Sequence, residues 1–260
     1  MEILIHSVQN SLRNTNYLLK TSKGEIFCVD PWEGEELSPM IDDLGGQLKA
    51  IINTHEHFDH IRGNEELVRR YGCEVWVHHH ATQKIPKATR GLRANEIIEL
   101  GNEESLIVLD TPGHTSSHLC LLIQEKGRAR GIFSGDTLFN AGVGNCHNGG
   151  DPETLYETII GQIYPLPDDV VVYPGHDYLL NNLRFTIDRE PHNLRAREML
   201  QNLASSGACE PQTLTTIGIE REINAFFRLD SLEIRQGLKL SLESTDKEVF
   251  LALRKLRNNW

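Results

Sequence analysis

The segment Thr54-His55-Glu56-His57-Phe58-Asp59-His60 constrains this chain more than any other part of its sequence. It places three imidazoles and two carboxylates within seven residues, directly after the apolar run Ala50-Ile51-Ile52. Imidazole and carboxylate groups are ligands of divalent zinc, iron and manganese. Burying so many of them is costly unless a cation lies among them. The cluster therefore predicts a metal site, for more than one ion, in a loop that follows a buried strand.

The spacing inside the cluster favours two ions over one. In an extended loop His55 and His57 stand at positions i and i+2, so their side chains point the same way and can bind one ion. Asp59 and His60 follow immediately and do not converge easily on that same ion. A second ion beside the first resolves this geometry, and two ions need further ligands from elsewhere in the chain.

Three later segments supply candidate ligands, and each follows a predicted strand. Small residues flank each ligand, so the backbone can turn sharply and deliver the side chain to the edge of a sheet. A carboxylate can bridge two metals that lie about 3.5–4 Å apart, which suits an aspartate. A single His or Asp in a loop is usually unremarkable, but the joint pattern favours a metal site. The candidates are His114 in Thr111-Pro112-Gly113-His114-Thr115, Asp136 in Ser134-Gly135-Asp136-Thr137, and His176 in Pro174-Gly175-His176-Asp177.

Strand and helix signals divide the chain at about residue 177. Up to that point, short apolar strands occur in two batches with flanking helices, which predicts two sheets packed face to face with helices outside. From residue 178 to 260 the chain is predicted to be mostly helical, with a Gly/Pro/Thr-rich link at 207–218. The strands are expected at 2–8, 17–21, 25–30, 48–53, 74–78, 105–110, 118–124, 131–134 and 170–173, and the helices at 39–44, 64–71, 151–160, 179–190, 193–204, 219–227 and 246–256.

Composition excludes several classes of partner. The formal net charge of −11, with no compensating basic tract, argues against nucleic acid as the main partner. No apolar run approaches the roughly 20 residues that span a bilayer, and the N-terminus lacks a secretory signal. Five dispersed cysteines indicate reduced thiols rather than a disulfide framework. We therefore expect a cytoplasmic protein with no membrane contact.

Taken together, the ligand motifs resemble the metallo-β-lactamase superfamily over residues 1 to about 176. The resemblance implies an α/β fold, the αββα sandwich, with the metals at one edge of the two sheets. The chain then divides into that domain, residues 1–177, and a helical substrate-binding region, residues 178–260. The resemblance assigns His55, His57 and His114 to a first ion, Asp59, His60 and His176 to a second, and Asp136 as a bridge between them. Asp59 and Asp136 are the candidate catalytic carboxylates, and His60 sets the chain apart from antibiotic-degrading members, which usually lack it.

A narrower resemblance to glyoxalase II, the hydroxyacylglutathione hydrolases, spans nearly the whole chain. It rests on residues 111–118, 134–139 and 174–193, and on the C-terminal Thr216-Ile217-Gly218-x-Glu220 and Arg254-x-x-Arg257-Asn258. It implies hydrolysis of S-(2-hydroxyacyl)glutathione, a small-molecule thioester, to glutathione and a 2-hydroxy acid. Two divalent ions (Zn, Fe or Mn) would supply hydroxide near neutral pH and polarise the thioester carbonyl. The leaving thiolate, with a pKa of roughly 8.5, needs no separate acid.

The same resemblance points to residues that contact the thiol carrier. Tyr178, Arg254 and Arg257 correspond to contacts of the glutathione carboxylates, although both arginines also fit the solvated face of a terminal helix. Where the family has a basic residue and a tyrosine against the glutathione backbone, this chain has Asn145 and His147. These five residues are the candidate substrate contacts.

Several other polar residues receive secondary interpretations. Asp30 and Asp177 are candidate acceptors that orient ligating imidazoles, although Asp30 also fits a turn. His118 is expected to be a satisfied core histidine or to support the site, and His78-His79-His80 is expected to form an exposed strand end rather than a metal site.

Two other functions fit the same fold. A persulfide dioxygenase would hold a single iron on two His and one Asp, and a lactone hydrolase would use the same two metals. The glyoxalase II-like C-terminal helices argue against the dioxygenase.

Overall fold

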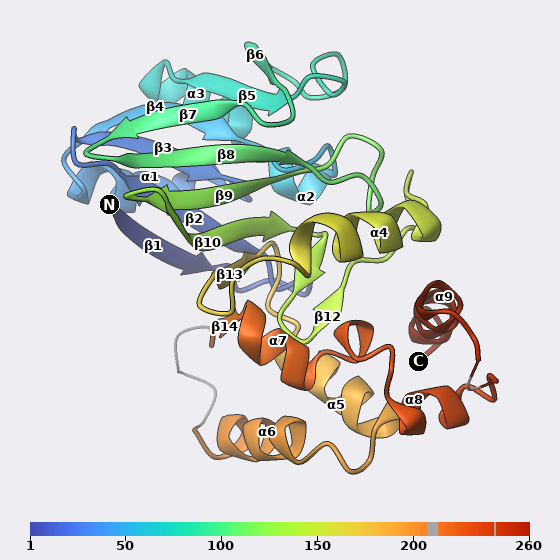
Figure 1. Ribbon diagram of the computed structural model, residues 1–260. Helices are drawn as coiled ribbons and strands as arrows, with labels where there is room; N and C mark the ends of the chain where they lie inside the picture. Colours follow the sequence, from blue (N-terminus) through green and yellow to red (C-terminus); the bar gives the residue numbers. More distant parts are fainter. Residues whose placement is uncertain (207–212, 242) are drawn as a thin grey trace.

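The computed structural model describes residues 1–206, 213–241 and 243–260. Two six-stranded sheets pack face to face with helices on their outer surfaces, and further helices gather beyond β13 and β14 (Figure 1). This is the αββα sandwich that the sequence predicts. Cys209 and residues 207–212 of the predicted link lie outside the described residues.

The first sheet comes from the N-terminal part of the chain, with strand order β1-β2-β3-β4-β5-β6. The pairs β1–β2 and β2–β3 are antiparallel, whereas β3, β4, β5 and β6 run parallel. Helices α1 and α3 cover its outer face, and the short α2 carries part of the histidine cluster. The elements are β1 (Glu2–Ser7), β2 (Thr15–Lys20), β3 (Glu25–Val29), α1 (Gly34–Asp43), β4 (Gln47–Ile52), α2 (Phe58–Ile61), α3 (Asn64–Tyr71), β5 (Glu74–His78) and β6 (Arg90–Leu92).

The second sheet has the order β14-β13-β10-β9-β8-β7. Helix α4 and the π-helix η1 that continues it cover its outer face together with α9. Asp151 caps α4 by accepting a hydrogen bond from the Thr154 amide. The elements are β7 (Ile97–Gly101), β8 (Glu104–Asp110), β9 (Leu119–Glu125), β10 (Arg128–Gly135), the hairpin β11 (Leu138–Phe139) and β12 (Gly142–Val143), α4 (Pro152–Thr158), η1 (Ile159–Ile163), β13 (Val171–Pro174) and β14 (Thr215–Thr216).

Helices complete the C-terminal part of the fold. Buried residues such as Leu183 and Ile223 join α5, α6 and α7 to Ala141 in the β11–β12 turn. Helix α9 begins with a capping box between Thr245 and Glu248, and it packs on α4. The elements are α5 (Leu179–Arg189), α6 (Leu194–Ser206), α7 (Ile217–Ile223), the 3₁₀-helix η2 (Ala225–Phe227), α8 (Leu232–Gly237) and α9 (Asp246–Arg257).

Alternation along the strands explains why both faces of each sheet are covered. In β3, Phe27 and Val29 face the other sheet, whereas Ile26 and Cys28 face α1 and α3. Successive side chains of a strand point to opposite faces, so a strand with apolar residues at every position must be buried on both sides. This patterning requires three apolar layers: one between the sheets and one on the outside of each.

Strand directions bring the site loops to one edge of the sandwich. Strand β8 is antiparallel to β9, β9 is antiparallel to β10, and β10 is parallel to β13. The carboxyl ends of β8, β10 and β13 therefore point the same way. The Leu119 amide donates to the Thr54 carbonyl at 2.8 Å, which ties the histidine loop of the first sheet to this edge of the second.

Some elements differ from the sequence-based expectation, each for a physical reason. Helix α1 begins five residues before Pro39, because Leu37 and Ile41 are both buried against the sheet. The hairpin β7–β8 was not predicted: Asn102 and Glu103 have φ of 49° and 61°, and a two-residue turn with both φ positive is normally signalled by Asn-Gly. Strand β6, β14 and helix α8 were also missed, because each is too short to show a period.

The expectation of an exposed strand end at His78-His79-His80 is wrong for its first residue. Strand β5 lies between β4 and β6, so its last residue, His78, is buried, whereas His80 is exposed. The four cysteines within the described residues, Cys28, Cys73, Cys120 and Cys146, are free thiols.

Candidate metal centre and adjoining pocket

Four loops carry the seven predicted ligands to the shared edge. His55 and His57 follow β4, and Asp59 and His60 lie in α2, which begins at Phe58. The other three follow the ends of β8, β10 and β13: His114, Asp136 and His176.

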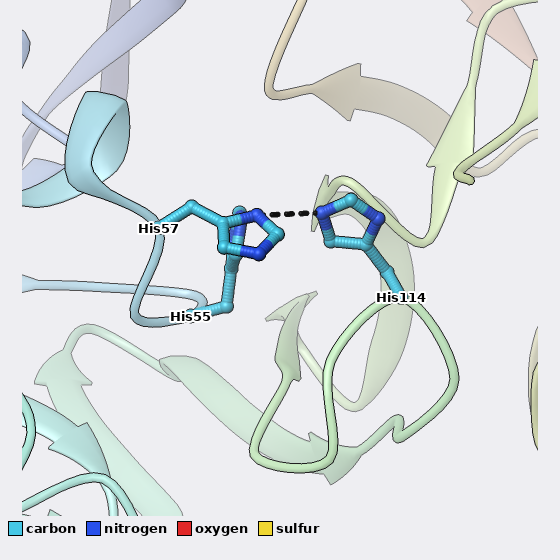
Figure 2. Close-up of side chains that lie close together, drawn as sticks. All are labelled: His55, His57 and His114. Atoms are coloured by element: carbon cyan, nitrogen blue, oxygen red, sulfur yellow. Dashed lines mark hydrogen bonds between the residues drawn. The ribbon is translucent and has the colours of Figure 1, made fainter. Parts of the chain in front are cut away.

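Three imidazoles form a first group, shown in Figure 2. His55 Nε2 and His114 Nε2 each lie 3.0 Å from His57 Nδ1. The rings of His57 and His114 point toward each other from opposite loops (Figure 2). Three ring nitrogens that face a common point are a typical arrangement for a transition-metal ion.

A second group combines two imidazoles with a carboxylate. His60 Nε2 and His176 Nε2 lie 3.2 Å apart, and Asp59 Oδ2 lies 3.5 Å from the former and 3.4 Å from the latter. His60 and His176 are buried. The set of two nitrogens and one oxygen suits zinc, iron or manganese.

Asp136 lies between the two groups. Its Oδ2 is 3.4 Å from His114 Nε2 in the first group and 3.3 Å from His176 Nε2 in the second. Its Oδ1 lies 3.4 Å from His60 Nε2 and is a buried atom with no hydrogen-bond partner among the described residues. A buried carboxylate oxygen without a partner is costly, and a cation beside Asp136 removes that cost.

The electrostatics of the cluster favour added positive charge. Burial lowers the pKa of His55, which keeps the ring neutral with a lone pair available for a metal. Burial alone would also lower the pKa of His60, but Asp136, Asp30 and Asp59 outweigh it and raise that pKa to about 10. Three carboxylates around one imidazole attract a cation, and the donor set therefore fits divalent metal ions.

The outer nitrogen of each of the five candidate imidazole ligands has its own partner. Such contacts fix the tautomer and orientation of each ring. Backbone carbonyls serve three of the rings and side chains serve two. The pairs are His55 Nδ1 with Thr54 Oγ1 (3.0 Å), His57 Nε2 with Asn148 O (3.0 Å), His60 Nδ1 with Asp30 Oδ2 (3.0 Å), His114 Nδ1 with Asn145 O (2.6 Å) and His176 Nδ1 with Leu12 O (2.8 Å).

Of the two predicted acceptors, Asp30 contacts a ligating ring. It also accepts hydrogen bonds from the amide and the hydroxyl of Thr54, at 2.8 and 2.6 Å. Asp30, His55 and His60 could themselves hold a metal ion by distance, but these three hydrogen bonds occupy the Asp30 carboxylate. The prediction for Asp177 is wrong, because the outer nitrogen of His176 faces the Leu12 carbonyl instead.

Glu56 and His118 support the loops but belong to neither metal group. Glu56, although it lies between two ligands in sequence, pairs with Lys84 at 2.6 Å and accepts hydrogen bonds from Ser117 and Thr115. Glu56 therefore joins the loop after β4 to the loop after β8. His118 is buried, and its Nε2 accepts from the Asp136 amide at 3.1 Å, in agreement with the predicted supporting role.

A pocket adjoins the metal groups, with an empty volume of about 510 Å³ that is partly open to solvent. All five candidate substrate contacts line it, although they come from two loops and a helix far apart in sequence. Four other residues also line it and were not predicted as substrate contacts, although Phe139, Asn182 and Asn258 lie in the segments that carry the resemblance. The lining residues are Phe139, Val143, Asn145, His147, Tyr178, Asn182, Arg254, Arg257 and Asn258.

Tyr178 connects the pocket to the metal groups. Its ring stacks on that of His176, with centroids 5.0 Å apart and planes 4° apart, and it meets Phe139 edge-on. Burial raises the pKa of the Tyr178 hydroxyl, so that it stays protonated and can donate a hydrogen bond. Through Tyr178, the pocket therefore adjoins His176, a candidate metal ligand.

Two arginines give the pocket its charge. Arg254 is 5% exposed, so the interpretation of this residue as part of a solvated helix face is wrong. Arg257 is half-buried, with its guanidinium 5.6 Å from the Phe185 ring centroid and 5.2 Å from that of Trp260. Among the described residues, neither arginine forms an ion pair with a carboxylate. Burial, followed by the charge of Arg257, lowers the pKa of Arg254 to about 10.

Comparison with known proteins identifies the class first. Residues 13–176 match the metallo-beta-lactamase superfamily. In fold, the chain is similar to the crystal structure of ETHE1 from Myxococcus xanthus, with a TM-score of 0.68 and 22% identity over 99% of this chain and 98% of the other. It is also similar to TTHA1623, solved in a di-iron-bound form, with a TM-score of 0.59 and 25% identity over 86% and 99% of the two chains.

The particular family follows from the C-terminal part and from whole-chain relatives. Residues 177–260 match the hydroxyacylglutathione hydrolase C-terminus. A hydroxyacylglutathione hydrolase from Nitrosococcus oceani is 43% identical over 96% of this chain and 97% of its own, and one from Polaromonas sp. is 42% identical over the same shares. The chain therefore belongs to the hydroxyacylglutathione hydrolase family of the metallo-β-lactamase superfamily. In the described part of the chain, the helices are too short or too polar to cross a membrane.

Proposed function

We propose that this protein hydrolyses the thioester of S-(2-hydroxyacyl)glutathione and uses two divalent metal ions, zinc, iron or manganese, to do so. The observation that carries the proposal is the junction at Tyr178. On one side of this ring lies the cluster of candidate metal ligands, and on the other a pocket with two arginines that pair with no carboxylate in the part of the chain that the structure describes. A thiol carrier with carboxylates and a hydrolysable bond fits both halves of this junction.

The two ligand groups support the binuclear part of the proposal. Each supplies three donors, and Asp136 reaches nitrogens of both. Bound ions would supply hydroxide near neutral pH and polarise the carbonyl under attack. The similar TTHA1623 structure was solved with two irons.

The charge distribution supports an anionic carrier. The chain as a whole has a formal net charge of −11, whereas the pocket contains the guanidinium groups of Arg254 and Arg257. A buried cation without a counter-charge is costly, and a carboxylate of the ligand would supply that charge. Relatives named hydroxyacylglutathione hydrolase, identical at up to 43% of positions, support glutathione as the carrier.

One sample can test this proposal. Purified protein is analysed for bound metal and then assayed for thiol release from S-lactoylglutathione, before and after removal of metal with a chelator. We expect two ions per chain, turnover that disappears with the metal, and recovery on adding it back. A fully loaded protein that releases no thiol would contradict the proposal.

The same sample separates the two alternative functions. Oxygen uptake with glutathione persulfide and one iron per chain would identify a dioxygenase. Opening of acyl lactones without thioester cleavage would identify a lactone hydrolase.

A further inference from the structure

Arg254 and Arg257 lie one turn apart on α9 and line the same pocket, but their contacts differ. Arg254 uses its Nη1 to donate to two backbone carbonyls, Val143 O at 2.9 Å and Gly144 O at 3.0 Å. Its Nε donates to Asn258 Oδ1 at 3.2 Å. The one hydrogen bond of Arg257 to a described residue is longer: its Nη2 donates to Asn182 Oδ1 at 3.5 Å. Arg254 is therefore held by the protein through its Nη1 and Nε, whereas Arg257 has only this one long contact.

The segment that Arg254 holds leads directly to the first metal group. Val143 ends β12, and the Gly144 amide donates to the Thr137 carbonyl at 3.2 Å. The next residue, Asn145, offers the carbonyl that orients His114, and three residues later Asn148 offers the carbonyl that orients His57. We call residues 142–149 the carbonyl segment. Two of the three imidazoles in the first group therefore depend on the path of this segment.

Packing leaves the carbonyl segment little freedom to compensate for a lost contact. A side chain at Gly144 would collide with the Asp136 carbonyl, so the backbone at this point lies directly against a ligand residue. At Gly142, a side chain would meet the amide group of Asn182. Arg254 holds the same segment through two of its carbonyls, and its guanidinium lies 5.4 Å from the Phe226 ring centroid.

We propose that Arg254 is a positioning residue, which holds the carbonyl segment and through it the orientation of His114 and His57. Arg257 remains a candidate contact for a carboxylate of the thiol carrier, as the resemblance already implies. This assignment rests on the proposed function for Arg257 but not for Arg254, whose contacts are all within the protein. It connects the C-terminal helix to the metal centre through backbone carbonyls rather than through the substrate.

Three substitutions on α9 test the proposal: Arg254→Met, Arg257→Met and, as a matched control, Lys255→Met. Lys255 is exposed on the same helix, so its replacement removes one positive charge without touching the carbonyl segment or the pocket. Arg254→Lys is included because lysine retains the charge but lacks the planar guanidinium, whose Nη1 reaches two carbonyls while its Nε reaches Asn258.

The first measurement is metal binding, by competition with a chelator and by the visible spectrum of the cobalt(II)-loaded protein. For Arg254→Met we expect affinity to fall about 10- to 100-fold, as for other contacts that orient ligands, and the cobalt spectrum to change. Arg254→Lys should show a smaller fall of the same kind. Arg257→Met and Lys255→Met should retain the wild-type spectrum and affinity. An unchanged spectrum and affinity in Arg254→Met would overturn the proposal.

The second measurement uses the metal-free protein and needs no activity. Amide hydrogen exchange in residues 142–149 should be faster in Arg254→Met than in the wild type or in Lys255→Met. Exchange in this segment as slow as in the wild type would overturn the proposal. Faster exchange throughout the chain would also overturn it, because that result indicates a general loss of stability rather than the loss of a local contact.

The third measurement is the kinetics of thioester hydrolysis. Arg257→Met should raise KM about 10- to 100-fold, the effect of losing a hydrogen bond to a charged group, with a smaller effect on kcat. Arg254→Met should act mainly on kcat, and a change confined to KM would contradict the proposal. If the wild type fails to hydrolyse thioesters, the proposed function fails, whereas the metal-binding and exchange measurements still test Arg254.

Discussion

Asp30 Oδ2 lies 3.0 Å from His60 Nδ1, on the side of the ring that faces away from the metal groups. Asp30 has a φ of 51°, a conformation that is uncommon for a residue other than glycine. The strain is tolerated because the carboxylate accepts hydrogen bonds from Thr54 as well as from the imidazole. One residue at the end of β3 therefore fixes both the start of the histidine loop and the orientation of a ligand.

Replacing Asp30 with asparagine should weaken metal binding. The amide nitrogen of asparagine cannot accept a hydrogen bond, so either Thr54 or His60 loses its partner. We expect metal affinity to fall about 10- to 100-fold, measured by competition with a chelator. Asp177→Asn is the matched control, since Asp177 orients no ligating ring, and it should bind metal as the wild type does. Equal losses in both variants would contradict this role of Asp30.

Gly175→Ala should disrupt the second metal group. A Cβ at this position would collide with Asp136 Oδ1 and lie 2.8 Å from His60 Cε1, which is closer than carbon atoms approach without displacement. We expect at least one ion per chain to be lost, as measured by elemental analysis. Gly161→Ala is the control, because nothing lies within 4 Å of its added methyl group. Full metal content in Gly175→Ala would show that the two ligands can move aside.

Removing the metal should lower the melting temperature. Without metal, Asp136 Oδ1 would have no partner among the described residues. The carboxylates around His60 would then face only the proton on that imidazole, in place of the metal ions. A ligand at 100 times its Kd stabilises the folded state by about 2.7 kcal/mol, which corresponds to roughly 5–10 °C for a chain of this size. Calorimetry of chelated and reloaded samples measures the difference. A melting temperature that does not depend on metal would contradict the assignment of the cluster.

The ion pair between Glu190 and Arg228 should contribute stability that acid removes. Burial alone would raise the pKa of Glu190, but hydrogen bonds from Arg228, Ser231 and Asn193 outweigh it and lower that pKa below 4.5. Because the folded-state pKa is lowered, this stability is present above pH 4.5 and is lost as pH falls through the folded-state pKa. At pH 7, Glu190→Gln should lower the free energy of unfolding by about 2–3 kcal/mol.

Urea unfolding of the metal-free wild type and Glu190→Gln at pH 7, 5 and 3 measures this effect. The difference between the two proteins should be present at pH 7 and pH 5 and shrink at pH 3. Glu243→Gln is the control, because it replaces an exposed carboxylate, and its stability should differ little from that of the wild type at any pH. A constant difference for Glu190→Gln would mean that the pair does not titrate as proposed.

The pattern of residue types along the chain was sufficient to predict the layered fold. Strands such as β3 and β9 are apolar at successive positions, and only burial on both faces accommodates this pattern. The ends of these strands carry imidazoles and carboxylates, whose metal chemistry is a property of the side chains themselves. Because both signals are local in sequence, the sandwich and the seven candidate ligands could be named without coordinates.

The supporting contacts required the three-dimensional structure. Every residue has a backbone carbonyl, so the sequence does not mark Leu12, Asn145 or Asn148 as the partners of ligating imidazoles. Glu56 carries a carboxylate, as a metal ligand could, but its side chain points toward Lys84 and pairs with it instead. Arg254 and Arg257 look equivalent in the sequence of the helix. Only the tertiary structure shows that β12 lies against Arg254, which donates to the Val143 carbonyl. The residue types along the chain thus determine which metal chemistry this cluster can support. The orientation of its imidazoles depends instead on which backbone atoms the packing brings within hydrogen-bond distance.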